Sequence, residues 1–249
     1  MRVTMFDGGH FTSAAGIWRR GEDLERQVRF PIPVYLIETG DERVLVDTGL
    51  HPGAAADART HYDGADSIGN FRLELDAGID RQIDLGGVTK VVLTHLHFDH
   101  AGGLALLPSS VSVFVQRREW EAGHDPAAIA RNFYLPRDYE DVAGQVVLVD
   151  GDHDLLGDGS VELISTPGHT PGHQSVRVGE GLVIGGDVTH FASGLDDQRL
   201  PIFGDDLDVQ RASAERLRAL REAGADVRPG HDPAVLAPGP VAIPGCPEG

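Results

Sequence analysis

The chain has 249 residues, of which 41% are hydrophobic, and this is enough for a sizeable core. Its 21 Lys and Arg residues against 39 Asp and Glu residues give a formal net charge of -18. Such a field repels phosphate backbones and anionic membrane surfaces, so we expect neither a nucleic-acid nor a membrane partner. No apolar segment approaches membrane-spanning length, and the N-terminus does not resemble a signal peptide, so a cytoplasmic location is the default expectation. Cys246 is the single cysteine, which excludes an intrachain disulfide.

In the first part of the chain, strands are predicted near 34–37 and 44–47, joined by a turn at Gly40-Asp41-Glu42. A helix is expected between 66 and 78, and the apolar run Val91-Val92-Leu93 predicts a buried strand. A strand over 111–116 and a helix beginning at 117–122 follow. Residues 124–144 are rich in charge and aromatic side chains, and we expect them to form a helical insertion over the pocket.

The second part predicts strands near 146–149, 161–165, 175–178 and 182–186, and then a helix from about 209 to 223. Leu217 and Leu220 give that helix its apolar spacing. We find no internal repeat, low-complexity segment or interdomain linker, so we expect one domain over 1–249. Periodicity alone predicts a mixed α and β chain.

A cluster of metal-binding residue types follows the strand at Val91-Val92-Leu93. The segment Thr94-His95-Leu96-His97-Phe98-Asp99-His100-Ala101-Gly102-Gly103 places three histidines and an aspartate within six positions. Unpaired imidazoles and carboxylates lose solvation in such a place, so the cluster indicates a metal site. His95 and His97 leave an extended backbone on the same side, whereas Asp99 and His100 follow the bend toward a second point. The loop can therefore supply two metals.

One loop cannot complete two coordination spheres, so further ligands are required from other strand ends. Three more segments supply them, each with a glycine directly before the candidate ligand: Gly168-His169 after the strand 161–165, Gly186-Asp187 after 182–184, and Gly230-His231 after 225–228. A residue without a side chain lets the backbone turn sharply toward a crowded ion. His173 follows His169 by four residues, and we expect it to support the site rather than to bind metal.

These motifs resemble the metallo-β-lactamase superfamily. The segments 94–103 and 166–175, with Val34-Tyr35-Leu36-Ile37-Glu38-Thr39 and Val44-Leu45-Val46-Asp47-Thr48-Gly49, resemble more narrowly the N-acyl-homoserine lactonases. The resemblance covers most of the chain. It implies an αββα sandwich of two mixed β-sheets flanked by helices.

The resemblance also divides the ligands between two metals. His95, His97 and His169 would hold one ion, Asp99, His100 and His231 the other, and Asp187 would bridge them. Asp47 would orient a ligand histidine. The lactonases commonly carry a tyrosine three residues after the bridging aspartate, and here that position is His190, which we weigh as a catalytic residue against a packing role. Trp18, Phe30, Phe133 and Tyr134 are candidates for an acyl pocket, although isolated aromatic residues more often belong to the core.

The expected reaction opens the lactone ring of N-acyl-homoserine lactones, that is, it degrades quorum signals. A hydroxide bridging two ions about 3.5–4 Å apart would attack the carbonyl, with Asp99 as proton shuttle and His190 as carbonyl donor. Zinc suits ligands without thiolates, and cobalt, manganese or iron are alternatives. A related metallo-hydrolase acting on other lactones, thioesters or phosphotriesters is the alternative enzyme, and a non-enzymatic metal-binding module is the third class. A homodimer is compatible with the sequence.

Overall fold

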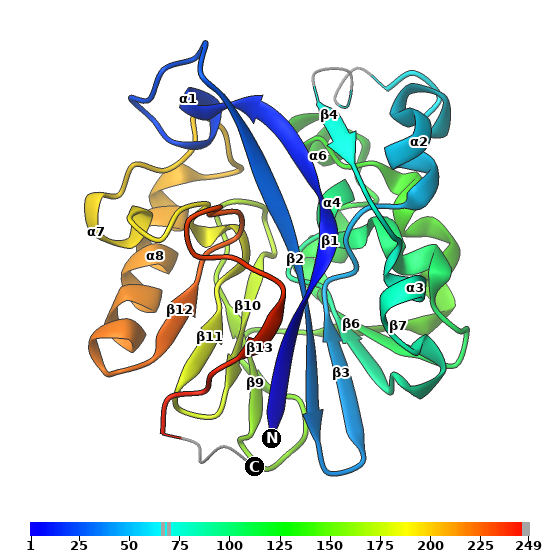
Figure 1. The fold of residues 1–249 in the computed structure, drawn as a ribbon, viewed down its shortest axis with the longest axis vertical. Helices are drawn as coiled ribbons and strands as arrows, with labels where there is room; N and C mark the ends of the chain where they lie inside the picture. Colours follow the sequence, from blue (N-terminus) through cyan, green and yellow to red (C-terminus); the bar gives the residue numbers. More distant parts are fainter. Residues whose placement is uncertain (66–67, 69–70, 246–249) are drawn as a thin grey trace.

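The computed structural model describes residues 1–65, 68 and 71–245. Their strands form two mixed sheets that pack face to face, with helices on both outer sides (Figure 1). This arrangement confirms the αββα sandwich that the resemblance implies. Cys246 lies outside the described residues.

The first sheet contains, within the described residues, eight strands in the order β13-β1-β2-β3-β5-β6-β7, with β4 paired to β1. Strands β1 to β3 pair antiparallel, whereas β3, β5, β6 and β7 pair parallel. The bounds are β1 Arg2–Ala14, β2 Gln27–Thr39, β3 Glu42–Val46, β4 Arg72–Glu74, β5 Lys90–Val92, β6 Ser112–Gln116, β7 Val146–Val149 and β13 Gly239–Val241.

The second sheet has five strands among the described residues, in the order β12-β11-β10-β9-β8. Only β11 and β12 pair parallel within it; the other neighbours in this part of the structure are antiparallel. The bounds are β8 His153–Asp154, β9 Val161–Ser165, β10 Gln174–Val178, β11 Leu182–Ile184 and β12 Asp226–Arg228.

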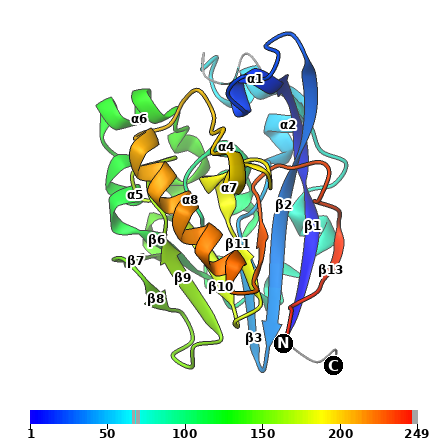
Figure 2. The ribbon, with the colours of Figure 1, turned by 90° about the vertical axis from the view of Figure 1, so that its left-hand side faces the viewer.

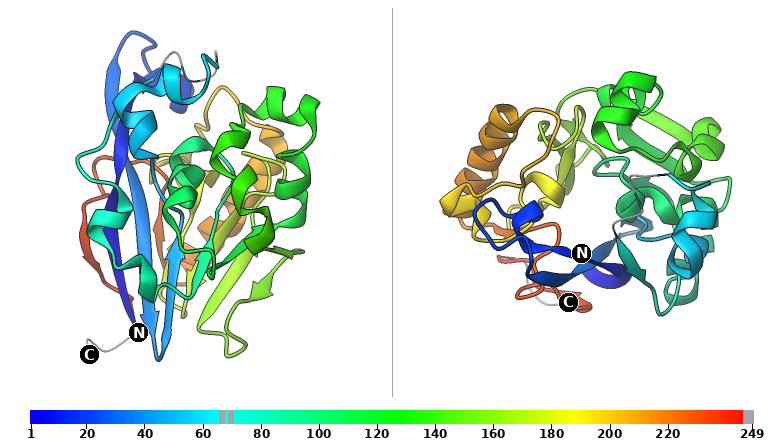
Figure 3. Two further views of the ribbon diagram at one scale, coloured as in Figure 1. Left: turned by 90° about the vertical axis from the view of Figure 1, so that its right-hand side faces the viewer. Right: turned by 90° about the horizontal axis from the view of Figure 1, so that it is seen from above.

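Helices cover the two outer faces. Figure 2 shows α7 and α8 on the outside of the second sheet, and the views of Figure 3 place the helices between β3 and β7 on the opposite side. The α-helices are α1 Ala15–Trp18, α2 Pro52–His61, α3 Ile79–Gln82, α4 Phe98–Ala101, α5 Arg117–Ala122, α6 Pro126–Asn132, α7 Gly194–Asp197 and α8 Leu207–Glu222. The 3-10 helices are η2 Leu85–Gly87, η3 Gly102–Leu106, η4 Pro136–Asp138, η5 Glu140–Gln145 and η6 Gly186–Val188.

Alternation along the strands explains why both faces of the first sheet are buried. In β2, Val34 and Leu36 pack toward the helices, whereas Tyr35 and Ile37 pack toward the second sheet. Successive side chains of a strand point to opposite faces, so an unbroken apolar run fills two core layers at once. A third layer joins Leu217 of α8 to the outer face of the second sheet.

The helix predicted between 66 and 78 is wrong where the structure can be compared with it. Residues Arg72–Glu74 form β4, which pairs antiparallel with β1. Phe71, Leu73 and Leu75 pack into an aromatic cluster while the residues between them are polar, a strand period that outweighs helix propensity here. Positions 66, 67, 69 and 70 of that expectation lie outside the described residues.

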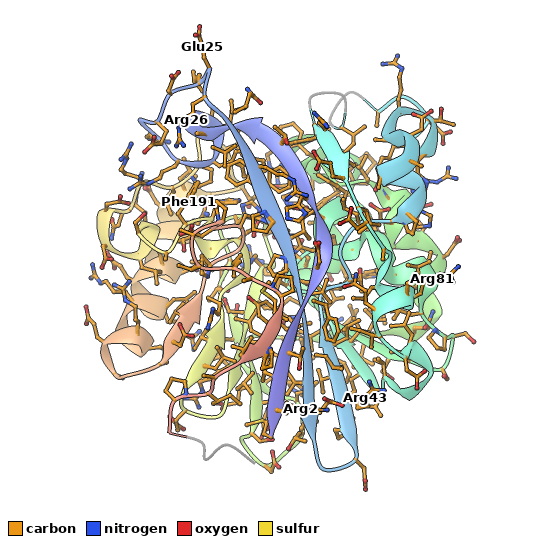
Figure 4. The ribbon with its side chains drawn as sticks, in the orientation of Figure 1. Arg2, Glu25, Arg26, Arg43, Arg81 and Phe191 are labelled. Atoms are coloured by element: carbon orange, nitrogen blue, oxygen red, sulfur yellow. The ribbon has the colours of Figure 1, made fainter. Side chains whose placement is uncertain are left out.

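Figure 4 shows which labelled residues lie toward the two ends of the sandwich. Arg2 and Arg43 both reach Glu38, and Figure 4 labels them near the lower end of the molecule. Phe191, next to His190 in sequence, lies in the upper half of the same view.

No helix in the described part of the chain is long and apolar enough to cross a membrane.

Candidate metal centre

The seven predicted ligands come together, and strands of both sheets deliver them. His95, His97, Asp99 and His100 follow β5 of the first sheet. From the second sheet, His169 follows β9, Asp187 lies in η6 after β11, and His231 follows β12. Their ligand atoms fall into two compact groups, one of His95, His97, His169 and Asp187 and one of Asp99, His100 and His231, and a third group brings His190 together with Asp187 and His231.

The first cluster consists of His95, His97, His169 and one oxygen of Asp187. The Nδ1 atom of His97 lies 2.8 Å from His95 Nε2 and 3.1 Å from His169 Nε2. Asp187 Oδ2 lies 3.4 Å from His169 Nε2 and 3.9 Å from His95 Nε2. These four ligand atoms all lie within 4.8 Å of one another, so they could share one ion.

The second cluster uses the other oxygen of Asp187. Asp187 Oδ1 lies 3.2 Å from His231 Nε2 and 3.6 Å from His100 Nε2. Asp99 Oδ2 completes the group at 3.4 Å from His231 Nε2 and 3.7 Å from His100 Nε2. Each oxygen of Asp187 thus faces a different cluster, the arrangement expected of a bridging carboxylate.

The opposite ring nitrogens are held by oxygen acceptors. His97 Nε2 donates to the carbonyl oxygen of Asn132 at 2.7 Å, and His231 Nδ1 donates to that of Pro31 at 2.8 Å. His100 Nδ1 donates to the carboxylate of Asp47 at 2.7 Å. Each bond fixes the ring orientation, so that in the neutral ring the other nitrogen carries the lone pair that a metal ligand needs.

This hydrogen bonding tests whether a cation fits. In the neutral rings, His97 Nδ1 is a bare lone pair that faces two more imidazole nitrogens of its cluster. His100 Nε2, His231 Nε2 and Asp187 Oδ1 are buried and have no hydrogen-bond partner among the described residues. When the two rings of the second cluster are neutral, these three buried acceptors face one another without a donor, and a divalent cation removes the repulsion between them. The donor set therefore fits metal ions.

The local charges favour the same conclusion. Burial and the neighbouring histidines hold the pKa of His95 well below its usual range, and burial likewise lowers the pKa of His97 and His169. At the second cluster burial is outweighed, because Asp99, Asp47 and Asp187 raise the pKa of His100 well above its usual range. The first cluster presents neutral nitrogens, and the second attracts positive charge.

Asp47 lies beside His100, one of the predicted ligands. Its carboxylate accepts from the backbone N–H of Thr94 at 2.7 Å and from the Thr94 hydroxyl at 2.9 Å, besides binding His100. Asp47 has φ +60°, a left-handed conformation that is uncommon for a residue with a side chain. Strain of this kind is retained where the surrounding structure requires it, often at functional sites.

The glycines before the ligands are required by close contacts. Gly168 has φ +124°, and a Cβ atom there would lie 2.2 Å from the backbone nitrogen of Gln210. A Cβ atom on Gly230 would lie 2.1 Å from Asp187 Oδ1. The sharp turns predicted at these positions are therefore present, and they allow the ligand loops to approach each other.

A cavity of about 600 Å³ opens onto both clusters. Of the four candidate aromatic residues, Trp18 and Phe133 line the cavity, whereas Phe30 and Tyr134 lie in the buried core rather than in the cavity wall. The polar part of its wall contains ligand candidates and the remainder is largely apolar. The lining residues are Ser13, Ile17, Trp18, Phe71, His97, Phe98, Asp99, Ala130, Phe133, Leu135, Asp187, Ile202 and Phe203.

His190 lies beside the first cluster. Its Nε2 atom is 3.1 Å from Asp187 Oδ2, yet neither ring nitrogen makes a hydrogen bond within the described residues. The ring is buried and packs at 4.8 Å from the ring of Trp18, a cavity residue. His190 therefore keeps its hydrogen-bonding capacity next to the carboxylate of Asp187.

Some residues that support the site were not predicted from the sequence. The carbonyl oxygens of Asn132 and Pro31 carry no signal, because every residue has a carbonyl group. Glu119 follows two arginines at the start of α5 and resembles an exposed helical residue, but it is fully buried. His173 was expected to support the site, and its Nε2 atom accepts from the backbone N–H of Asp187 at 3.0 Å.

A family model described as the metallo-beta-lactamase superfamily matches residues 27–223. The chain belongs to this superfamily. The matched range contains every predicted ligand except His231, and it runs from β2 to the end of α8.

Curated members of the superfamily resemble the chain over most of its length. The N-acyl homoserine lactonase AttM of Azorhizobium caulinodans is 34% identical over 228 residues, covering 86% of this chain and 84% of the relative. AttM of Rhizobium johnstonii is 32% identical, covering 86% and 85%. An N-acyl homoserine lactonase of Bacillus cereus is 29% identical, covering 78% and 77%.

Solved structures share the fold. An N-acyl homoserine lactone hydrolase with N-hexanoyl-L-homoserine at its catalytic metal center has a TM-score of 0.80 at 23% identity, covering 94% of both chains. The dizinc quorum-quenching lactonase AidC has a TM-score of 0.69 at 18% identity, covering 99% of this chain and 95% of its own. At these identities the structures show the common αββα fold.

Proposed function

We propose that this superfamily member is a dinuclear metal-dependent hydrolase that opens the lactone ring of N-acyl-homoserine lactones. The apolar cavity that opens onto both ligand clusters carries the proposal. Its metal-facing end, with His97, Asp99 and Asp187, suits a polar ester ring, and Trp18 and Phe203 offer surface to an acyl chain. The curated relatives are N-acyl homoserine lactonases, which supports this substrate class.

Divalent metal binding follows from the superfamily and the donor set, and we propose two ions, with zinc the best match. Cobalt, manganese and iron suit the same nitrogen and oxygen ligands. When bound, such ions supply a nucleophile from water at neutral pH and polarise the ester carbonyl. His95, His97 and His169 would hold one ion, Asp99, His100 and His231 the other, and Asp187 would bridge.

Asp99 and His190 are the proposed catalytic residues. Asp99 contributes one oxygen to the second cluster and lines the cavity, so it can receive the proton of the attacking water. As the ring C–O bond breaks, Asp99 returns that proton to the leaving alkoxide, and the product is the acyl-homoserine. The unpartnered ring nitrogens of His190 leave one free to donate to the substrate carbonyl.

We further infer that residues 1–249 act as one domain, because both sheets supply ligands to each proposed ion. His95 and His97 come from the first sheet, and His169 and Asp187 come from the second. Neither half alone contains a complete ligand set.

The proposed function is tested with metal-loaded enzyme on short- and long-chain acyl-homoserine lactones, together with a thioester and a phosphotriester. We expect ring opening of the lactones, with one oxygen of solvent water entering the new carboxylate. Discrimination should stay within about 1–3 kcal/mol per methylene, because an apolar pocket rejects a missing methylene only weakly. Hydrolysis of the thioester or phosphotriester with intact lactones would contradict the proposal.

A further inference from the structure

Glu119 is a buried carboxylate to which the reaction assigns no role. It lies in α5 and is 0% exposed. Burial raises the pKa of its carboxyl group, although the hydrogen bonds that the group accepts act in the opposite direction. Among the described residues it forms no ion pair with Arg, Lys or His. Burying a carboxylate without a cation is costly, so the surroundings of Glu119 must compensate for its burial.

The contacts of Glu119 join the two loops that carry the first cluster. Its Oε1 atom accepts from the backbone N–H of Leu96 at 3.0 Å, and Leu96 separates His95 from His97. Its Oε2 atom accepts from the backbone N–H of Gly172 at 2.9 Å, three residues after His169. One carboxylate thus holds a loop of each sheet.

Two more contacts fix the carboxylate itself. The Tyr134 hydroxyl donates to Oε1 at 2.8 Å and limits rotation of the group. A Cβ atom on Gly172 would lie 2.2 Å from the backbone nitrogen of Glu119, so α5 and the His169 loop approach as closely as a glycine permits. The distance between these loops therefore depends on this contact.

We propose that Glu119 is a positioning residue that sets the separation of His95 and His97 from His169, and so the affinity and geometry of the first metal position. The inference rests on the proposed metal centre. A carboxylate suits the task because it offers an acceptor atom to each loop. An amide offers a single acceptor atom, so glutamine would leave one backbone N–H facing an NH₂ group whichever way it turned.

The test is cobalt titration of the wild-type protein and Glu119→Gln, followed by the visible absorption of the bound ions. His97→Ala and His231→Ala provide reference spectra with the first or the second cluster impaired. In Glu119→Gln, we expect affinity at the first cluster to fall about 10- to 100-fold and its absorption bands to change, with the second cluster much less affected. Glu121→Gln is the matched control, because Glu121 is an exposed residue of the same helix.

A milder variant covers the case in which Glu119→Gln does not fold. Tyr134→Phe keeps both backbone contacts and loses only the hydroxyl, so it should weaken the first position by roughly 2- to 10-fold. Selective loss in either variant supports the proposal.

Three results would overturn the inference. Folded Glu119→Gln with wild-type cobalt affinity and spectrum would remove its basis. Equal weakening of both clusters, matched by a loss of unfolding free energy, would make Glu119 purely structural. If Glu119→Gln does not fold but Tyr134→Phe does, Tyr134→Phe that binds cobalt as tightly as the wild type would contradict the positioning role of Glu119. Wild-type protein that takes up no cobalt would instead refute the metal centre on which the proposal depends.

Discussion

The proposed ligand histidines donate hydrogen bonds to acceptors of different kinds. His100 donates to a carboxylate, whereas His97 and His231 donate to backbone carbonyl groups. A carboxylate partner makes the imidazole a stronger ligand than a carbonyl partner does, because it stabilises the ring's positive charge. The two clusters therefore differ electronically, which suits different roles in one reaction.

His190 provides the sharpest test at the scale of single residues. If it donates to the substrate carbonyl, His190→Ala should lower kcat/KM by about 10- to 1000-fold, as loss of one contact to a developing oxyanion does. Metal content, measured by elemental analysis, should not change if His190 is a carbonyl donor, whereas loss of metal would assign it to the ligand group with Asp187 and His231.

Two controls separate donation from packing. His190→Tyr restores a donor at this position and should recover part of the activity, whereas His190→Phe fills the space without a donor. His153→Ala removes an exposed histidine of β8 and should leave kcat/KM unchanged. Undiminished kcat/KM in His190→Phe would make His190 a packing residue.

The ligand candidates could be predicted from the sequence because their side chains have distinctive chemistry. Residues that support the site through a backbone group could not. His95, His169 and Asp187 stand out because imidazoles and carboxylates at strand ends are costly unless they bind something. Asn132 could not be found, because its backbone carbonyl acts on His97 and its side chain does not. Such a contact depends on where a whole segment packs.

Among the elements, the segment 124–144 confirms the predicted helical insertion over the pocket. It contains α6, η4 and η5 within the described residues. Helix α6 ends at Asn132, whose carbonyl oxygen holds His97, and the next residue, Phe133, lines the cavity. The same helix end therefore contacts a proposed ligand and shapes the proposed acyl site.

This insertion contains a buried acid that should make stability depend on pH. Asp138 in η4 is bound by the Tyr62 hydroxyl at 3.1 and 3.2 Å, and burial raises the pKa of its carboxyl group to about 8. The folded protein then keeps this proton between about pH 4 and 8 while the unfolded chain has lost it. Its contribution is full below pH 4 and is lost as pH rises toward 8.

Asp138→Asn removes this titration. The free energy of unfolding of the variant minus that of the wild type should therefore rise with pH across this window, by at most about 1.4 kcal/mol per pH unit. Denaturant unfolding from pH 4.5 to 8.5 measures the difference, and Asp63→Asn, at an exposed position, should show no such slope. A difference that is constant with pH would rule out a protonated Asp138.

Strands with a clear apolar pattern were predicted from the sequence, whereas a strand that depends on pairing with distant segments was not. The apolar runs of β2, β5 and β9 identify them as buried strands. Strand β1 was not predicted, because Gly8-Gly9 interrupts it and its register shifts between Asp7 and His10. Its pairing with β2 and β4 stabilises it, which is tertiary context that local pattern does not contain.

At the scale of the whole molecule, the ligand clusters lie where the two sheets meet. The first sheet supplies four ligands through the loop after β5, and the second supplies His169, Asp187 and His231. The sandwich could be predicted only through resemblance to a family, since periodicity indicates strands and helices but not how sheets face each other. The packing between the sheets positions ligands that lie more than a hundred residues apart.

This placement makes bound metal a link between the sheets, so removing it should destabilise the whole fold. Each ion that binds the native state alone adds RT ln(1 + [M]/Kd) to the free energy of unfolding, about 2.7 kcal/mol at a hundredfold excess over Kd. For a chain of this size the corresponding fall in Tm on chelation is roughly 5–10 °C for each ion removed. Thermal unfolding of chelated, reloaded and untreated protein measures this fall in Tm, with Asp187→Ala as the variant in which both positions are impaired.

Reloading should restore Tm in the wild type and have little effect in Asp187→Ala, because that carboxylate faces both clusters. Equal Tm values for stripped and loaded wild-type protein would show that the ions do not join the two sheets.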